Sequence, residues 1–403
     1  MIVKRVLKVT FILFASFVLG FVTLLALLRI DRKTSLILPE PRGPFGVSRL
    51  TETWTDEHRA DPFVDAPSES LTELAVWIWY PSEKAPDLGA ADYLPPEWRH
   101  ELEARQNLMS SLTKDLSAIH PHSVLDGPIS KKQPSYPLVI LRGGLGAPVV
   151  NYTILAEDLA SHGYVVVGFD APYRTTAVVF PGKRVVTRPS NLDPENLGKE
   201  AQDRLMAHLL TAWVSDIGFV LDRLKQLNES TGSRFLGKLD LQKVGIVGHS
   251  LGGAAAAQFS HDDSRCVAGI DLDGALSDNV VKEGLRGPFM FLLSDHRGAK
   301  DPVDLQIAAD IKSVCDRMPP ESGMALSIQG ANHFSFSDQM LLRNQAVVSV
   351  VQRVMGLRLE SRRGLEIAAE TVHRFLDVHL KGAPASSIHA LLKEYPELTP
   401  EPR

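Results

Sequence analysis

The sequence predicts an α/β fold, with a mostly parallel sheet covered by helices on both faces. Short apolar segments of strand length alternate with segments of helical periodicity throughout residues 136–382. Two of these segments, 136–144 and 164–172, are continuous apolar runs, which fit strands buried on both faces of a parallel sheet. A charge-free stretch at 9–28 predicts a membrane-spanning helix ahead of this fold.

The elements are expected in a regular order along the chain. Aromatic and β-branched residues alternate over 74–81, which predicts a first strand, and two prolines open a helix expected over 95–119. The remaining strands are expected at 136–144, 164–172, 241–250, 265–274, 287–295 and 324–333. The remaining helices are expected at 152–163, 199–228, 252–260, 303–317 and 365–382.

The N-terminal residues 1–33 are interpreted as an uncleaved signal anchor. Residues 9–28 match the length that a helix needs to cross a bilayer, and no small-residue cleavage site follows them. Three basic residues flank the stretch on each side: Lys4, Arg5 and Lys8 before it, and Arg29, Arg32 and Lys33 after it. A short N-terminal tail and a long C-terminal domain favour an inside N-terminus, so the domain is expected in the periplasm or outside the cell.

Residues 34–70 are rich in proline, glycine, serine and charge, which predicts a linker. The folded domain is expected to cover 71–403. Two insertions are expected in it, near 83–135 and, as an irregular proline-containing segment, at 173–198.

The composition excludes several classes of protein. The net charge is −5 and no long basic run occurs, which argues against nucleic acid as a partner. The two cysteines, Cys266 and Cys315, are too few for a disulfide scaffold and are expected to be free, packed thiols. No zinc-type spacing of cysteine and histidine occurs. The run 261–263, His-Asp-Asp, is interpreted as a solvated loop rather than a metal site.

The stretch VGIVGHSLGGAAAA at 244–257 predicts a nucleophilic serine on a sharp turn between a strand and a helix. Gly248 and Gly252 stand two residues before and after Ser250, where the backbone passes close to the turn and glycine fits best. The first turn of the following helix directs free N–H groups and its positive dipole end at the serine.

A histidine after the last expected strand is the candidate base, and His333 occupies that place. Three aspartates are candidates for the acid that supports it. Asp271 and Asp273 end the strand after the elbow helix, and Asp295 ends the next strand. Most hydrolases with this order of serine, acid and histidine carry the acid at the place of Asp295, so position alone slightly favours Asp295 and leaves the choice open.

An oxyanion hole requires two backbone N–H groups. The residue after the nucleophile, Leu251, supplies one, and the glycine-rich loop 142–147 after the strand at 136–144 supplies the other. A phosphate-binding loop is a poor alternative, because neither Gly-x-Gly-x-x-Gly nor Gly-Lys-Ser/Thr occurs there.

Five motifs resemble the platelet-activating-factor acetylhydrolase type of α/β-hydrolase, which includes lipoprotein-associated phospholipases and bacterial esterases. They are GGLGA, LASHGYVVV, GHSLGG, IDLDG and GANHFSFSD, and the resemblance covers roughly residues 70–382. It implies that the acid is Asp273, 23 residues after the serine, and that Leu145 and Leu251 donate to the oxyanion. It also implies that no cofactor is needed. The animal phospholipases carry a histidine where this chain has Gly143, which weakens any transfer of lipid specificity.

The motifs and the resemblance together predict a membrane-anchored serine hydrolase of carboxylic esters. The resemblance implies short-chain or oxidised acyl groups, with phospholipid among the candidate substrates. A general carboxylesterase or polyester hydrolase of the same fold is the first alternative, and a binding protein that has lost catalysis is the second.

Overall fold

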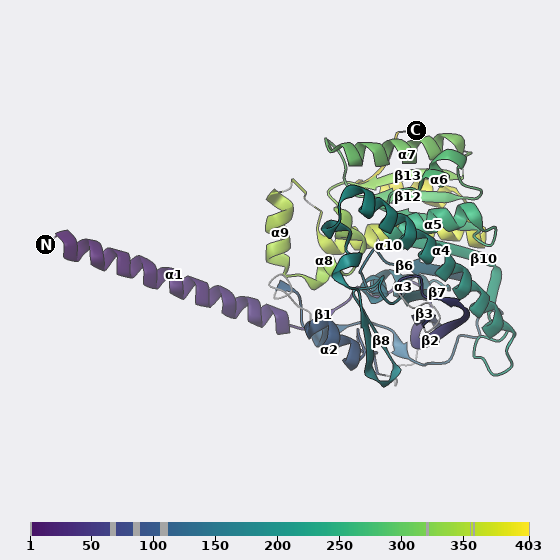
Figure 1. Ribbon diagram of the computed structural model, residues 1–403, viewed down its shortest axis with the longest axis horizontal. Coiled ribbons are helices and arrows are strands. Elements are labelled where there is room, and N and C mark those ends of the chain that lie inside the picture. Colours follow the sequence, from purple (N-terminus) through teal and green to yellow (C-terminus); the bar gives the residue numbers. More distant parts are fainter. Residues whose placement is uncertain are drawn as a thin grey trace.

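The computed structural model (Figure 1) describes residues 2–64, 70–83, 89–104, 112–319, 322–354, 356–357 and 359–402, with side chains from residue 14 onward. The strands are β1 Leu36–Ile37, β2 Gly46–Ala60, β3 Leu71–Ser82, β4 Ile119–His120, β5 Val124–Leu125, β6 Tyr136–Arg142, β7 Val165–Asp170, β8 Ala177–Phe180, β9 Arg184–Thr187, β10 Leu239–His249, β11 Ala268–Leu272, β12 Phe289–Leu293, β13 Gly323–Ile328 and β14 Leu398–Pro400. The helices are α1 Ile2–Lys33, α2 Pro96–Ala104, α3 Thr153–Ser161, α4 Lys199–Glu229, α5 Leu251–Asp262, α6 Asp278–Glu283, α7 Pro302–Arg317, α8 Gln339–Leu342, α9 Gln345–Val354, α10 Ser361–Lys381 and α11 Ser386–Glu394.

The described residues form one ten-stranded sheet in the order β14-β13-β12-β11-β10-β6-β7-β3-β2-β5. Its central strands, from β13 to β7, pair in parallel. At the edges, β14 is antiparallel to β13, β3 is antiparallel to both β7 and β2, and β2 pairs in parallel with β5. The expected α/β fold is therefore confirmed. Because the central strands share one direction, their carboxyl ends lie along one edge of the sheet. The loops after β6, β10, β11, β12 and β13 all meet at that edge.

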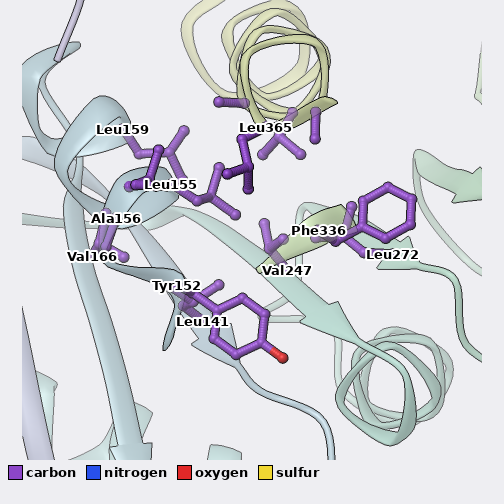
Figure 2. Packing of buried hydrophobic residues seen from close by; sticks show 14 of the residues in the cluster. Leu141, Tyr152, Leu155, Ala156, Leu159, Val166, Val247, Leu272, Phe336 and Leu365 are labelled. Atoms are coloured by element: carbon purple, nitrogen blue, oxygen red, sulfur yellow. The ribbon is translucent and has the colours of Figure 1, made fainter. Parts of the chain in front are cut away.

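Helices cover both faces of the sheet. On one face, α3 and α10 pack on apolar side chains of the strands; Figure 2 shows Leu155 and Leu159 of α3, Leu365 of α10, and Val247 of β10 in this cluster. On the other face, α4 and α5 bury a second cluster, to which α4 contributes Trp213. The strands between are buried on both faces, which is why their sequences are continuous apolar runs.

The expected linker at 34–70 is wrong for residues 46–60, which form β2. This long strand pairs antiparallel with β3, and it buries Val47, Leu50 and Trp54. Charged residues dominate its second half, where much of the strand is exposed, and they gave the segment the composition of a linker. On the edge away from β3, β2 pairs only with the short β5, so most of that edge has no neighbouring strand. Charged side chains on such an edge discourage pairing with strands of other molecules.

The secondary structure of both expected insertions differs from the expectation. The helix expected over 95–119 is α2 at its start, its middle part 105–111 lies outside the described residues, and its end is a 3-10 turn at Leu116–Ala118. The segment 173–198 was expected to be irregular but contains the β8–β9 hairpin, whose valine-rich strands flank a turn at Pro181–Lys183.

The N-terminal helix α1 projects away from the rest of the molecule (Figure 1). Its segment Phe14–Lys33 is long and apolar enough to cross a membrane and buries none of its residues. By the same measure α4 also qualifies, but α4 is partly buried against the sheet and belongs to the core. The end of α1 is attached to the domain through Asp31, which pairs with Lys114 and accepts a hydrogen bond from Asn344.

Two glycines allow close backbone packing at the turn between β10 and α5. Gly248 lets β10 lie close to the start of α5, and Gly252 lets the start of α5 lie close to the end of β6. A Cβ atom at Gly248 would lie 1.9 Å from the carbonyl oxygen of Gly252. A Cβ atom at Gly252 would lie 2.6 Å from the carbonyl oxygen of Arg142 at the end of β6. Neither contact can be relieved by moving a side chain, because the opposing atoms are backbone atoms. The predicted requirement for glycine at both positions therefore has a steric cause.

Gly248→Ala is expected to lower the free energy of unfolding by about 3 kcal/mol, near the upper end of the cost of overpacking. Gly218→Ala is the matched control, because Gly218 lies inside α4 and its added Cβ would make only ordinary contacts, with Arg265 Nη2 at 3.7 Å and Phe259 Cε2 at 4.0 Å. The control should be neutral or stabilising by up to about 1 kcal/mol, since glycine is a poor helix former. Urea denaturation measures both changes, and equal stabilities of the two variants would contradict the steric argument.

Candidate active site

Ser250 lies between β10 and α5 with a φ of 57° and a ψ of −125°. This conformation is costly for a residue with a side chain, and such strain is concentrated at functional sites. The turn is held by its backbone, since the N–H of Ser250 donates to the carbonyl of Leu272 on the neighbouring strand β11. The serine thus has the strand-turn-helix context that the motif requires.

A cleft of about 1990 Å³ opens at the carboxyl edge of the sheet, above the elbow. Six residues singled out from the sequence line it: Leu145, Ser250, Leu251, Asp273, Asp295 and His333. Residues 193–195 at the end of the 173–198 segment and side chains of α4 also line the cleft. The cleft exceeds the roughly 300–1,000 Å³ of a typical small-molecule pocket, so it has room for a bulky ligand.

The carboxylate of Asp273 lies at the centre of the site and is only 3% exposed. It accepts hydrogen bonds from His333 Nδ1 at 2.9 Å, from the N–H and hydroxyl of Ser294 at 2.8 and 2.9 Å, and from His296 Nε2 at 3.0 Å. Burial by itself would raise the pKa of Asp273, but the donated hydrogen bonds from His296, His333 and Ser294 hold it well below its usual range. Asp273 is therefore ionised.

The other two candidate acids have different partners. Asp271 is fully buried under the start of α5, where it accepts from the N–H of Gly274, and burial raises its pKa well above the usual range. Asp295 binds Arg297 and the N–H of Gly330. Hydrogen bonding to Arg297 lowers the pKa of Asp295 to about 2. Among the described contacts, only Asp273 of the three aspartates bonds to His333, so the geometry favours Asp273 as the acid.

The glycine-rich loop after β6 lies beside Ser250, where a Cβ atom at Gly144 would be 3.3 Å from the Cβ of Ser250. The N–H of Gly144 donates to Tyr152 Oη, and that of Gly146 donates to the carbonyl of Arg174. Between them, the N–H of Leu145 has no acceptor among the described residues and is available to a ligand. Leu251 is the first residue of α5, where N–H groups lack partners within the helix. Both predicted oxyanion donors are thus placed beside Ser250.

A buried chain of hydrogen bonds connects this loop to the candidate base. The hydroxyl of Tyr152 is 2.8 Å from His249 Nδ1, and His249 Nε2 is 2.7 Å from the carbonyl oxygen of His333. Burial lowers the pKa of His249 to about 4, so its ring is neutral. These hydrogen bonds then all run in one direction. The N–H of Gly144 donates to Tyr152 Oη, the hydroxyl of Tyr152 donates to His249 Nδ1, and the Nε2–H of His249 donates to the carbonyl oxygen of His333.

Sequence reasoning missed four residues of this site: Tyr152, His249, Ser294 and His296. His249 lies inside the recognised GHSLGG motif, and Ser294 and His296 lie at or just after the end of the strand expected at 287–295, which was an available signal. Tyr152, by contrast, reaches the loop from the residue that precedes α3. Among the hydrogen bonds of the described residues, none joins Ser250 to His333. Such contacts often tighten only when substrate binds. No group of side chains that could hold a metal ion occurs in the described part of the chain.

A family model described as platelet-activating factor acetylhydrolase, isoform II, matches residues 64–384. The chain belongs to this family. The platelet-activating factor acetylhydrolase of Cavia porcellus is 27% identical over 226 residues, which cover 50% of this chain and 48% of the relative. A probable 1-alkyl-2-acetylglycerophosphocholine esterase of Arthroderma benhamiae is 24% identical and is matched over 91% of this chain and 94% of its own length.

Among solved structures, a ferulic acid esterase from Streptomyces cinnamoneus superposes with a TM-score of 0.72 at 25% identity. The superposition covers 92% of this chain and all of the esterase. The expected family and fold are confirmed by these matches. The alignments to the first animal relatives cover only 48% and 57% of those proteins, so this chain spans about half of their length.

Asp273→Asn is expected to lower kcat on p-nitrophenyl acetate by roughly 10⁴-fold, because an amide there favours the wrong tautomer of His333. Asp295→Asn is the matched control and should retain kcat within about threefold, since its carboxylate contacts Arg297 and not His333. Steady-state kinetics of both variants measure the difference. The assignment is wrong if only the change at Asp295 abolishes turnover.

Tyr152→Phe should lower kcat about tenfold, because it leaves the N–H of Gly144 and His249 Nδ1 without their partner. Tyr164→Phe removes a buried hydroxyl of the same kind, bonded to Asp377 and away from the cleft. That control should lose stability but keep kcat. Thermal unfolding and kinetics together separate the two effects, and native kcat in Tyr152→Phe would show that the chain of hydrogen bonds does not act on the site.

Proposed function

We propose that this protein hydrolyses carboxylic esters through an acyl-enzyme, with Ser250 as nucleophile, His333 as base and Asp273 as acid. The observation that carries the proposal is the hydrogen bond between the buried Asp273 and His333 beside a strained elbow serine. Membership of a family of acetylhydrolases supports it. A protein that had lost catalysis would have no reason to keep this set of side chains together, which argues against a binding role.

The geometry supports a two-step reaction. His333 takes the hydroxyl proton of Ser250 as its oxygen attacks the acyl carbonyl, and Asp273 stabilises the imidazolium that forms. The N–H groups of Leu145 and Leu251 bind the oxyanion. Collapse of the tetrahedral intermediate breaks the ester bond, and the leaving alcohol receives the proton from His333. Water then attacks the acyl-enzyme with His333 again as base, which releases the acid and restores Ser250.

The proposed substrates are esters with short or oxidised acyl groups, including phospholipids with an acetyl-like chain. The names of the relatives, which are acetylhydrolases and an alkyl-acetyl-glycerophosphocholine esterase, support this class. The wide cleft also has room for the large alcohol part of such an ester. The similarity to a ferulic acid esterase favours one alternative, a general carboxylesterase that accepts aromatic esters.

We further propose that α1 anchors the protein in a membrane, with the domain on the periplasmic or outer side. Its exposed apolar surface supports the membrane anchor. The short N-terminal tail and the long C-terminal domain support the orientation. A signal peptide that is removed would also have an apolar helix of this length near the N-terminus. N-terminal sequencing of the mature protein distinguishes the two, because a chain that begins after residue 33 would contradict the anchor.

A fluorophosphonate probe should label the folded protein at Ser250 and leave Ser250→Ala unlabelled. Absence of labelling in folded native protein would overturn the enzymatic proposal.

A series of p-nitrophenyl esters should show kcat/KM falling at least tenfold between butyrate and decanoate. The same acyl chains on glycerophosphocholine separate the candidates: a phospholipase hydrolyses the short-chain phospholipids, whereas a general esterase acts only on the p-nitrophenyl series.

A further inference from the structure

The acid of the site is shared by two imidazole rings. His333 Nδ1 is 2.9 Å from Oδ2 of Asp273, and His296 Nε2 is 3.0 Å from Oδ1 of the same carboxylate. An ionised carboxylate only accepts hydrogen bonds, so each of these ring nitrogens carries a proton directed at Asp273. The triad mechanism uses one such ring. The second one is therefore a group that the mechanism leaves unexplained.

The two rings come from different loops. His333 follows β13, whereas His296 follows β12, two residues after Ser294. The hydroxyl of Ser294 lies 3.1 Å from His296 Nε2 and donates to Oδ2 of Asp273. The His296 side chain is 41% exposed and lines the cleft, so its other ring nitrogen can exchange protons with solvent.

The charged groups around His296 favour a positive ring. Its hydrogen bond to Asp273 raises the pKa of His296, and Asp304 of α7 and Glu401 after β14 add to the effect. The neighbouring Arg297 is paired with Asp295. On the far side of Asp273, the ring of His333 packs at a tilt of 38° against the ring of His249. His249 is neutral because burial lowers its pKa to about 4.

We propose that His296 is a positioning residue for the acid of the triad, and that its charge state sets how strongly Asp273 supports His333; this inference rests on the proposed function. By holding Oδ1, His296 keeps Oδ2 directed at His333. When His296 is neutral, the full negative charge of Asp273 stabilises the imidazolium that forms on His333. When His296 is protonated, part of that charge is already compensated, so His333 becomes a weaker base and its imidazolium is less stable.

The proposal predicts two steps in the acid limb of the pH profile of kcat/KM. Activity falls partly as His296 gains its proton, and the remaining activity is lost in a second step. Gln places an amide N–H close to the position of Nε2 but does not titrate, so His296→Gln should show a single step. That step should lie at higher pH than the final step of the native enzyme, by roughly half a pH unit, because solvent screens a charge this exposed.

His296→Leu removes the donor altogether and should lower kcat about tenfold with KM unchanged, as expected for one charge-assisted hydrogen bond to a carboxylate. His296→Gln should restore most of that loss. The exposed His58→Gln, which lies on β2, is the matched control and should keep both steps of the native profile. Thermal unfolding confirms that each variant is folded before its kinetics are compared.

Two outcomes would overturn the proposal: a native pH profile in His296→Gln, or an unchanged kcat in folded His296→Leu. Labelling of each variant by the fluorophosphonate probe is measured alongside. Suppose that native protein reacts with the probe and hydrolyses p-nitrophenyl acetate, and that the variants keep the native pH profile and kcat. The proposed role of His296 is then wrong, and the proposed function stands. If native protein does neither, the proposed function itself fails.

Discussion

The buried carboxylate of Asp273 is the group on which the rest of the site depends. A charge that is 3% exposed is costly unless it is fully hydrogen-bonded, and three residues from two loops supply its donors. Ser294 and His296 approach after β12, and His333 approaches after β13. Because β11, β12 and β13 follow one another in the sheet and run parallel, their carboxyl ends deliver the donors to one place. The order of strands therefore fixes which side chains can meet at Asp273.

The two halves of the site are connected through the elbow itself. Ser250 and His249 are consecutive, so the strained turn that presents the hydroxyl to the cleft also buries the imidazole behind it. That imidazole connects Tyr152, which holds the oxyanion loop through Gly144, to the backbone of His333. A shift of the elbow would consequently move both the proposed oxyanion donors and the proposed base. Such shared support is how a fold keeps catalytic groups in register to within a fraction of an ångström.

The sequence specified the features that arise from local sterics and from strand order. Ser250 and its glycines were predicted because the motif that contains them spans only five residues, and His333 because it follows the last parallel strand. The three candidate acids could not be separated by position, since two residues along a strand end decide whether a carboxylate points under α5, as Asp271 does, or towards the cleft. His296 and Tyr152 were missed because their partners are distant in sequence. The strand β2 was missed because its exposed charges resemble a linker.

Three histidines in one site show how environment divides the same side chain among different tasks. His249 lies behind the elbow, where burial lowers its pKa to about 4 and fixes it as a neutral connector with one tautomer. His296 stands at the mouth of the cleft, where Asp273 and two further carboxylates favour its charged form. His333, which is also exposed to the cleft, contacts Asp273 through Nδ1, and this leaves its Nε2 free for the proton transfer that we propose. The environments differ because each ring leaves a different strand end, so the assignment of tasks follows from the topology of the sheet.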